Sequence, residues 1–147
     1  MSERYLYREV MRPPLWLMLF FAFMLSSFVL AIWAALDIKA TIVTAVISGL
    51  IIIAVPILGA EKILLTDSEL RVGRAHIERK YLGAVEEIAT SDFVVLRTRG
   101  ADPAAHHALV FWVSRGVKVT IEDDRDATPY WLISSKHSAE LKRALES

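Results

Sequence analysis

The sequence predicts an α+β membrane protein, in which a transmembrane helical hairpin is followed by a small antiparallel β domain that a C-terminal helix closes. Three observations predict this fold class. Two apolar runs occupy residues 15–60, short alternating segments separated by turns fill most of 61–147, and an amphipathic segment ends the chain. Residues 1–14 are expected to form a basic cytoplasmic tail, so the chain divides into a tail, a hairpin and a β domain.

The two apolar runs are each long enough to cross a bilayer. Residues 15–36 and 40–60 contain no Asp, Glu, Lys, Arg or His. At about 1.5 Å per residue each run reaches about 30 Å, which matches the hydrocarbon core. Only residues 37–39 separate them, so the spans form a tight hairpin. The alternative, two buried helices of a soluble protein, needs more surrounding chain than the remaining residues supply.

Basic residues indicate the orientation of the hairpin. Arg4, Arg8 and Arg12 precede the first span and further basic residues follow the second, whereas the hairpin tip carries only Lys39. Cytoplasmic flanks are enriched in Lys and Arg. We therefore expect a multi-pass protein of the cell (inner) membrane with both termini in the cytoplasm.

Small residues recur at four-residue spacing in both spans and form a stripe along each helix. Such stripes let helix backbones approach closely in lipid. They could join the two helices of the hairpin, or contact another membrane protein or a second copy of this chain. The spans lack the ionisable residues of ion paths and transport sites. The stripe residues are Ser27, Ala31 and Ala35 in the first span and Thr41, Ala45 and Gly49 in the second.

The β domain is predicted from period-two alternation and turn residues, which together indicate six or seven strands. Residues 114–116 are expected to form the turn of a hairpin, Phe93 to Leu96 could add a strand, and residues 138–146 form the closing helix, with Leu141 and Leu145 on one face. The expected strands are 62–66, 69–72, two within 75–88, 109–113, 117–122 and 130–134.

Composition excludes several classes of function. The 17 basic and 17 acidic residues cancel, so the chain lacks the basic field that nucleic-acid binding requires. It contains no cysteine, which excludes disulfides, thiol nucleophiles, thiolate zinc sites and cysteine-ligated iron–sulfur clusters. We expect no cofactor and no metal.

Candidate catalytic and metal-binding residues have simpler structural explanations. His106 and His107 are adjacent and point to opposite sides of an extended chain, so they are interpreted as solvated loop residues. The carboxylates of 122–126 lack the glycine and the terminal glutamate of a calcium loop and are interpreted as an acidic turn. Ser134 and Ser135 lie near a lysine and a histidine but in no nucleophile motif. We assign no catalytic residue.

Four basic residues follow the second span closely and are candidates for contact with anionic lipid headgroups. Each contributes about 1 kcal/mol if it lies at the membrane surface. Interleaved glutamates dilute this charge, and the lipid bilayer remains the main expected partner. The four are Arg71, Arg74, Arg79 and Lys80.

Several segments resemble the bacterial family catalogued as domain of unknown function 3093, and the most specific segment contains Pro129, Tyr130 and Trp131. The resemblance covers nearly the whole chain and implies topology and membrane location, but no activity. More loosely, strands closed by a C-terminal helix resemble bacterial pleckstrin-homology-like domains. The segments are Tyr7-Arg8-Glu9, Pro13-Pro14 and residues 70–75, 101–105 and 128–135.

The sequence favours a non-catalytic, membrane-anchored binding or scaffolding module at the cytoplasmic membrane surface. It contains no catalytic constellation, and no flexible linker separates the second span from the first strand. One alternative is an enzyme that acts on a lipid or envelope precursor through Arg71, Arg74 and residues 123–126. The other is an accessory subunit of a larger membrane complex, which the small-residue stripes would serve.

Overall fold

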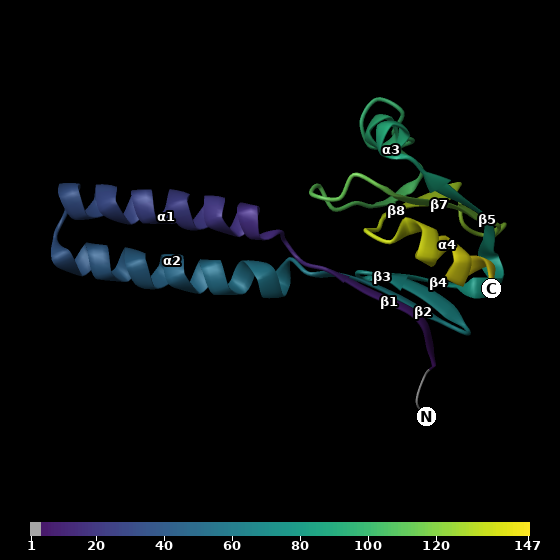
Figure 1. The fold of residues 1–147 in the computed structure, drawn as a ribbon, viewed down its shortest axis with the longest axis horizontal. Helices are drawn as coiled ribbons and strands as arrows, with labels where there is room; N and C mark the ends of the chain where they lie inside the picture. The colour runs from purple at the N-terminus through teal and green to yellow at the C-terminus, as the bar shows by residue number, and fades with distance from the viewer. Residues whose placement is uncertain (1–3) are drawn as a thin grey trace. The chain divides into compact units, whose positions relative to one another are not determined.

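A computed structural model describes residues 4–147 of the chain as two compact units. One is the hairpin, residues 12–60, and the other is the β domain, residues 4–11 and 61–147. Figure 1 shows the elements, which in chain order are β1 (Tyr5–Met11), α1 (Leu15–Ala35), α2 (Ile38–Leu58), β2 (Glu61–Thr66), β3 (Glu69–Val72), β4 (Ala75–Glu78), η1 (Arg79–Tyr81), β5 (Leu82–Ile88), α3 (Thr90–Arg97), β6 (His106–Ala108), β7 (Gly116–Ile121), β8 (Tyr130–Ser134) and α4 (Ser138–Glu146).

Two helices, α1 and α2, form the hairpin at nearly the predicted positions. The second begins earlier than predicted because the Asp37 carboxylate accepts the Ala40 N–H at 2.9 Å and caps it. Both helices are long and apolar enough to span a membrane, and only 6% of the most apolar window of each is buried. The alternative of two buried helices in a soluble protein predicts a much larger buried share within the described residues.

The small-residue stripe of α1 lies outside the contact between the two helices. Ser27, Ala31 and Ala35 are exposed, whereas the half-buried positions of α1 include Ala22 and Val29. The first stripe therefore does not join the hairpin helices, and its role as a contact with another molecule stays a prediction. In α2, by contrast, the half-buried positions include two of the stripe residues, Thr41 and Gly49.

Strand β1 corrects the prediction of a separate tail over residues 1–14. Tyr5–Met11 pairs antiparallel with β2, with Met11 opposite Glu61. Alternate side chains, including those of Glu9 and Met11, are buried, as expected for a strand with one face on a core. The segment before α1 is therefore part of the β domain, and residues 1–3 of the predicted tail lie outside the described residues.

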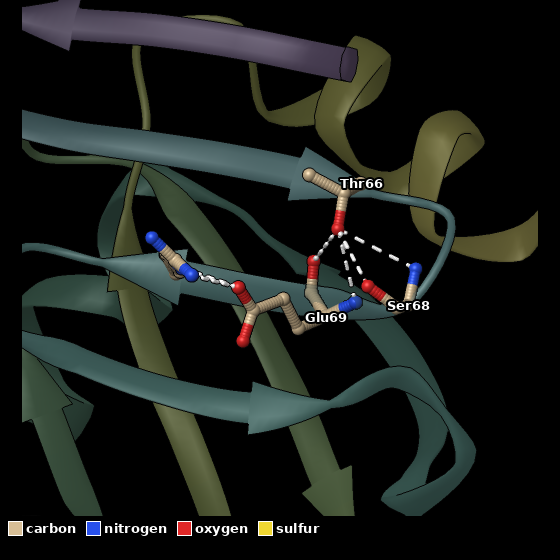
Figure 2. A network of polar contacts seen from close by, with 4 residues as sticks. Thr66, Ser68 and Glu69 are labelled. Atoms are coloured by element: carbon tan, nitrogen blue, oxygen red, sulfur yellow. Dashed lines mark hydrogen bonds and ion pairs between the residues drawn. The ribbon is translucent and has the colours of Figure 1, made fainter. Parts of the chain in front are cut away.

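The first sheet has the order β1-β2-β3-β4 and is antiparallel throughout. Figure 2 shows the β2–β3 turn, where the buried Thr66 hydroxyl accepts the Glu69 N–H at 3.1 Å and donates to the Glu69 carbonyl at 3.2 Å. Between β3 and β4 the chain turns at Gly73, whose φ of 60° favours a residue without a Cβ.

The second sheet has the order β5-β7-β8-β6, and one pair in it was not predicted. Strand β6 pairs parallel with β8, so the β domain is not purely antiparallel. The hairpin predicted between 109–113 and 117–122 is wrong, because β7 pairs with β5 and β8. Residues 109–113 are not a strand: the Val110 N–H donates to the Ser134 hydroxyl at 3.0 Å instead of to a neighbouring strand.

Helix α3 replaces the strand considered at Phe93 to Leu96. Phe93 is fully buried and Leu96 packs beside it, while Val94 and Val95 are exposed. Burial at i and i+3 is the period of a helix, not of a strand.

The β domain core lies between its two sheets, and α4 contributes to it. The helix contacts β1 of one sheet and β5 and β7 of the other (Figure 1). Its predicted inward residues Leu141 and Leu145 are both buried. The buried Ser138 hydroxyl at its start donates to Glu87 in β5 at 2.6 Å.

Candidate functional site

The strongest polar cluster in the β domain surrounds the buried carboxylate of Glu9 in β1. One oxygen, Oε2, accepts the Tyr7 hydroxyl at 2.8 Å and the Ser135 hydroxyl at 2.6 Å. The other, Oε1, accepts the Lys136 N–H at 2.9 Å and lies 3.6 Å from His137 Nδ1. A buried carboxylate requires such partners. The cluster therefore ties β1 to the β8–α4 connection.

Burial raises the pKa of the Tyr7 hydroxyl above its ordinary value. The Glu9 carboxylate also raises this pKa, whereas the hydrogen bond with Ser135 acts in the opposite direction. A raised pKa keeps Tyr7 protonated at neutral pH. The Tyr7 hydroxyl therefore remains a hydrogen-bond donor to Glu9 at neutral pH.

The two serines near this cluster serve the fold. Ser134 and Ser135 are fully buried. The Ser134 hydroxyl accepts from Val110 N–H, and the Ser135 hydroxyl donates to Glu9 and accepts the His137 N–H at 3.1 Å. Neither hydroxyl is open to a substrate, so the arrangement anchors chain segments and activates no nucleophile.

A cavity of about 260 Å³ lies between β4, η1 and the β7–β8 loop. The Arg125 guanidinium lies 5.5 Å above the Tyr81 ring centroid and 3.3 Å from Asp123. Asp123 raises the pKa of Arg125, and hydrogen bonds from Thr128 lower the pKa of Asp126. The lining residues are His76, Ile77, Glu78, Tyr81, Asp123, Arg125, Asp126 and Trp131.

The loop predicted as an acidic turn supplies one wall of this cavity. Its carboxylates bond within the loop: Asp123 accepts the Arg125 N–H at 3.0 Å, and Asp126 accepts the Thr128 N–H at 2.9 Å. Within residues 4–147, no group of three or more His, Asp or Glu side chains could hold a metal ion.

The two histidines predicted to be solvated loop residues lie in strand β6. His106 packs on the Trp131 ring with centroids 4.6 Å apart, and His107 Nε2 lies 3.0 Å from the Asp102 carbonyl. Both are half-buried. They occupy a strand because β6 pairs with β8, a partner distant in sequence that local pattern does not reveal.

The four predicted headgroup contacts do not form one basic patch. Arg71 pairs with Glu69 and Lys80 pairs with Glu78 at 2.6 Å, while Arg79 donates to the Ala144 carbonyl at 3.4 Å. Glu69 lies opposite Glu78 and Val72 opposite Ala75 in the β3–β4 ladder. This register puts Arg74 and the Arg79-Lys80 pair at opposite ends of that hairpin.

Of the three residues in the most specific segment, Trp131 belongs to the core. It is 6% exposed. Tyr130 is half-buried, and Lys118 Nζ lies 4.5 Å from its ring centroid. The Pro129 carbonyl accepts the Ile121 N–H at 3.1 Å and extends the β7–β8 ladder. The segment builds a central strand and one wall of the cavity.

The sequence did not lead us to predict Glu9 as a buried site residue, although the alternating pattern around it is present in the sequence. Tyr7, Glu9 and Met11 alternate with outward or less buried side chains, which is the period of a strand. A charged residue at an inward position is read from sequence alone as evidence against burial, so its partners at 135–137 become apparent only in the fold.

These features define a class of protein with two apolar, membrane-length helices joined at both ends to a two-sheet β domain. The sequence model of the family described as "Protein of unknown function (DUF3093)" matches residues 6–145. The chain belongs to this family. No curated protein and no solved structure matches it.

Proposed function

We propose that the protein is a non-catalytic binding or scaffolding module held at the cytoplasmic surface of the inner membrane by its helical hairpin. The pairing of β1 with β2 carries this proposal. These strands flank the hairpin in sequence, so the β domain is joined to the helices twice, through residues 12–14 and 59–60. At about 3.5 Å per residue, both connections are short. A domain held in this way has little freedom to leave the membrane surface.

The same pairing supports the proposed topology. Because both ends of the hairpin join one sheet, they belong on one side of a bilayer that the helices span. Arg8 and Arg12 flank the first helix on that side and Lys39 is at the tip, which supports a cytoplasmic β domain. The two sheets and the closing helix α4 support the loose architectural likeness to pleckstrin-homology-like domains, which by itself assigns no function.

Recognition of a partner is tested by photocrosslinking in cells. A photoreactive amino acid replaces Asp126 at the cavity mouth, and a matched control replaces Glu146, which is exposed on α4. The proposal predicts a discrete crosslinked species from position 126 and none from 146. Equal labelling at both positions, or none at either, would contradict recognition through the cavity.

A role as an accessory subunit, or as a homo-oligomer, is favoured by one specific observation. Ser27, Ala31 and Ala35 are exposed on α1. A stripe of small residues that is open to the membrane suits close approach by another helix. Disulfide crosslinks between two Ala31→Cys chains support the homo-oligomer, and their absence alongside intact membrane insertion counts against it.

A further inference from the structure

The exposed apolar side chains of the β domain gather at one place. In its described residues, large hydrophobic side chains are exposed at Tyr5 and at three positions in two segments that contact each other: Phe111 (62%), Val95 (53%) and Val94 (38%). The core does not need these three, because α3 already buries Phe93 and Leu96. Exposed apolar residues that form a patch mark sites of interaction with proteins or membranes, whereas isolated exposed apolar residues do not.

Direct contacts join the two segments that carry these residues. Leu109 packs with the cluster under α3, and Arg97 Nη1 donates to the Phe111 carbonyl at 3.4 Å. Phe111 packs edge-on against Trp112 with ring centroids 4.9 Å apart. Helix α3 and the 109–115 segment thus present a joint surface, which we call the α3 surface.

Three arginines lie within or next to the two segments of the α3 surface in sequence. Arg97, Arg99 and Arg115 form no ion pair within the part of the chain that the structure describes. The carboxylates nearby in sequence are Asp92, at the start of α3, and Asp102, which accepts the Ala104 N–H at 2.9 Å. The predicted lipid contacts Arg71 and Lys80, by contrast, are paired with glutamates.

We propose that the α3 surface binds the anionic surface of the phospholipid bilayer. Val94, Val95 and Phe111 enter the boundary between headgroups and acyl chains, as the apolar face of an interfacial helix does. The three arginines contact lipid phosphates. Exposed apolar residues together with arginines that form no ion pair complement such a surface in both polarity and charge.

This inference rests on the proposed function, in which the hairpin anchors the β domain to the bilayer. It adds the face of the domain that meets the lipid. It also moves the lipid contact from the β3–β4 hairpin, where the sequence predicted it, to α3 and the 109–115 segment.

Depth-dependent quenching of a single fluorophore tests the proposal. The chain contains no cysteine, so Val95→Cys in the full chain carries one environment-sensitive label. The protein is placed in nanodiscs, one copy per disc, with and without phosphatidylglycerol. We expect blue-shifted emission and quenching by spin-labelled lipid at position 95 in anionic discs. Asp67→Cys, labelled in the β2–β3 turn, should be quenched at least about twofold less.

Charge variants separate the lipid contact from other causes. Replacing Arg99 and Arg115 together by glutamine should reduce quenching at position 95 at least about twofold, and high salt should do the same. Near-ultraviolet circular dichroism should be unchanged, because both side chains are exposed. Quenching that is independent of lipid charge and of the arginines would overturn the proposal.

Two further measurements distinguish failure of the lipid-binding surface from failure of the proposed function. A label at Ile47→Cys, within α2, reports insertion of the hairpin. Quenching at position 47 without quenching at position 95 refutes the lipid-binding surface alone, and quenching at neither refutes the proposed function as well. Energy transfer between labels at position 95 in two-copy discs, without lipid quenching, would assign the surface to a second copy and refute lipid binding.

Discussion

Glu9 holds the N-terminal strand to a segment more than one hundred residues later in the chain. Its carboxylate collects hydrogen bonds from Tyr7, Ser135 and the Lys136 backbone. Burying a carboxylate without partners costs free energy, whereas hydrogen bonds donated to a buried carboxylate are strong. Residues 12–14 then connect β1 to α1.

Removing the carboxylate should destabilise the β domain. Glu9→Ala leaves the Ser135 hydroxyl and the Lys136 N–H without their acceptor, so we expect a loss of about 3 kcal/mol in the free energy of unfolding. Urea unfolding of the full chain in detergent, followed by near-ultraviolet circular dichroism, measures it. The matched control Glu86→Ala, at an exposed position of β5, should cost about 0.5 kcal/mol or less. Equal losses would show that the cluster has no structural role.

The raised pKa of Tyr7 predicts that the β domain loses stability at alkaline pH. Its pKa is higher in the fold than the ordinary value of 10.0, so the unfolded chain releases this proton first. The stabilisation is complete below pH 10 and is lost as pH rises above it. Between pH 9 and 11, Tyr7→Phe should therefore lose less stability than the wild type, as measured by thermal unfolding at each pH. The exposed-site control Tyr5→Phe should behave like the wild type, and an identical pH slope for Tyr7→Phe would refute this assignment.

At the scale of elements, the sequence predicted helices best where one pattern, apolar or amphipathic, runs through the whole segment. The uncharged runs of α1 and α2 and the amphipathic α4 carry long, uniform signals, and the structure has them at or close to the predicted bounds. Strands β2, β3 and β8 also follow from alternation and turn residues.

Elements whose form depends on distant partners were missed. Residues 109–113 are apolar enough for a strand, but Ser134 satisfies the Val110 N–H, and Val110 and Val113 are buried without strand pairing. The short β6 exists because β8 offers a free edge. The run Phe93 to Leu96 is apolar at every position, so its period is visible only after burial distinguishes Phe93 and Leu96 from the two valines.

The antiparallel pairing of β7 with β8 requires glycine at position 116. A Cβ there would lie 1.9 Å from the Ile133 carbonyl oxygen and 2.7 Å from the Phe93 ring. Because backbone atoms on a central strand cannot move aside, Gly116→Ala should destabilise the β domain by about 3 kcal/mol. Thermal unfolding of the full chain measures the change. Gly100→Ala, where the nearest atom is 3.4 Å away, is the matched control and should change stability by less than about 1 kcal/mol.

At the scale of the whole molecule, the chain leaves the β domain after β1 and returns to it at β2. The sequence predicted the hairpin and the β domain but not this closed path, because residues 5–11 were interpreted as part of a tail. The candidate site shows the same limit: two of the segments that carry the family resemblance, Tyr7-Arg8-Glu9 and 128–135, meet only through the fold.

The most direct test of a membrane-anchored β domain is the accessibility of single thiols in intact cells. Lys39→Cys at the hairpin tip, and Asp67→Cys and Ser147→Cys in the β domain, each give one thiol in a chain without cysteine. The chain should stay in the membrane fraction after alkaline washing. A membrane-impermeant reagent should label position 39 in intact cells, and positions 67 and 147 only after lysis. Labelling of position 67 or 147 in intact cells, or release of the chain by alkaline washing, would contradict the account.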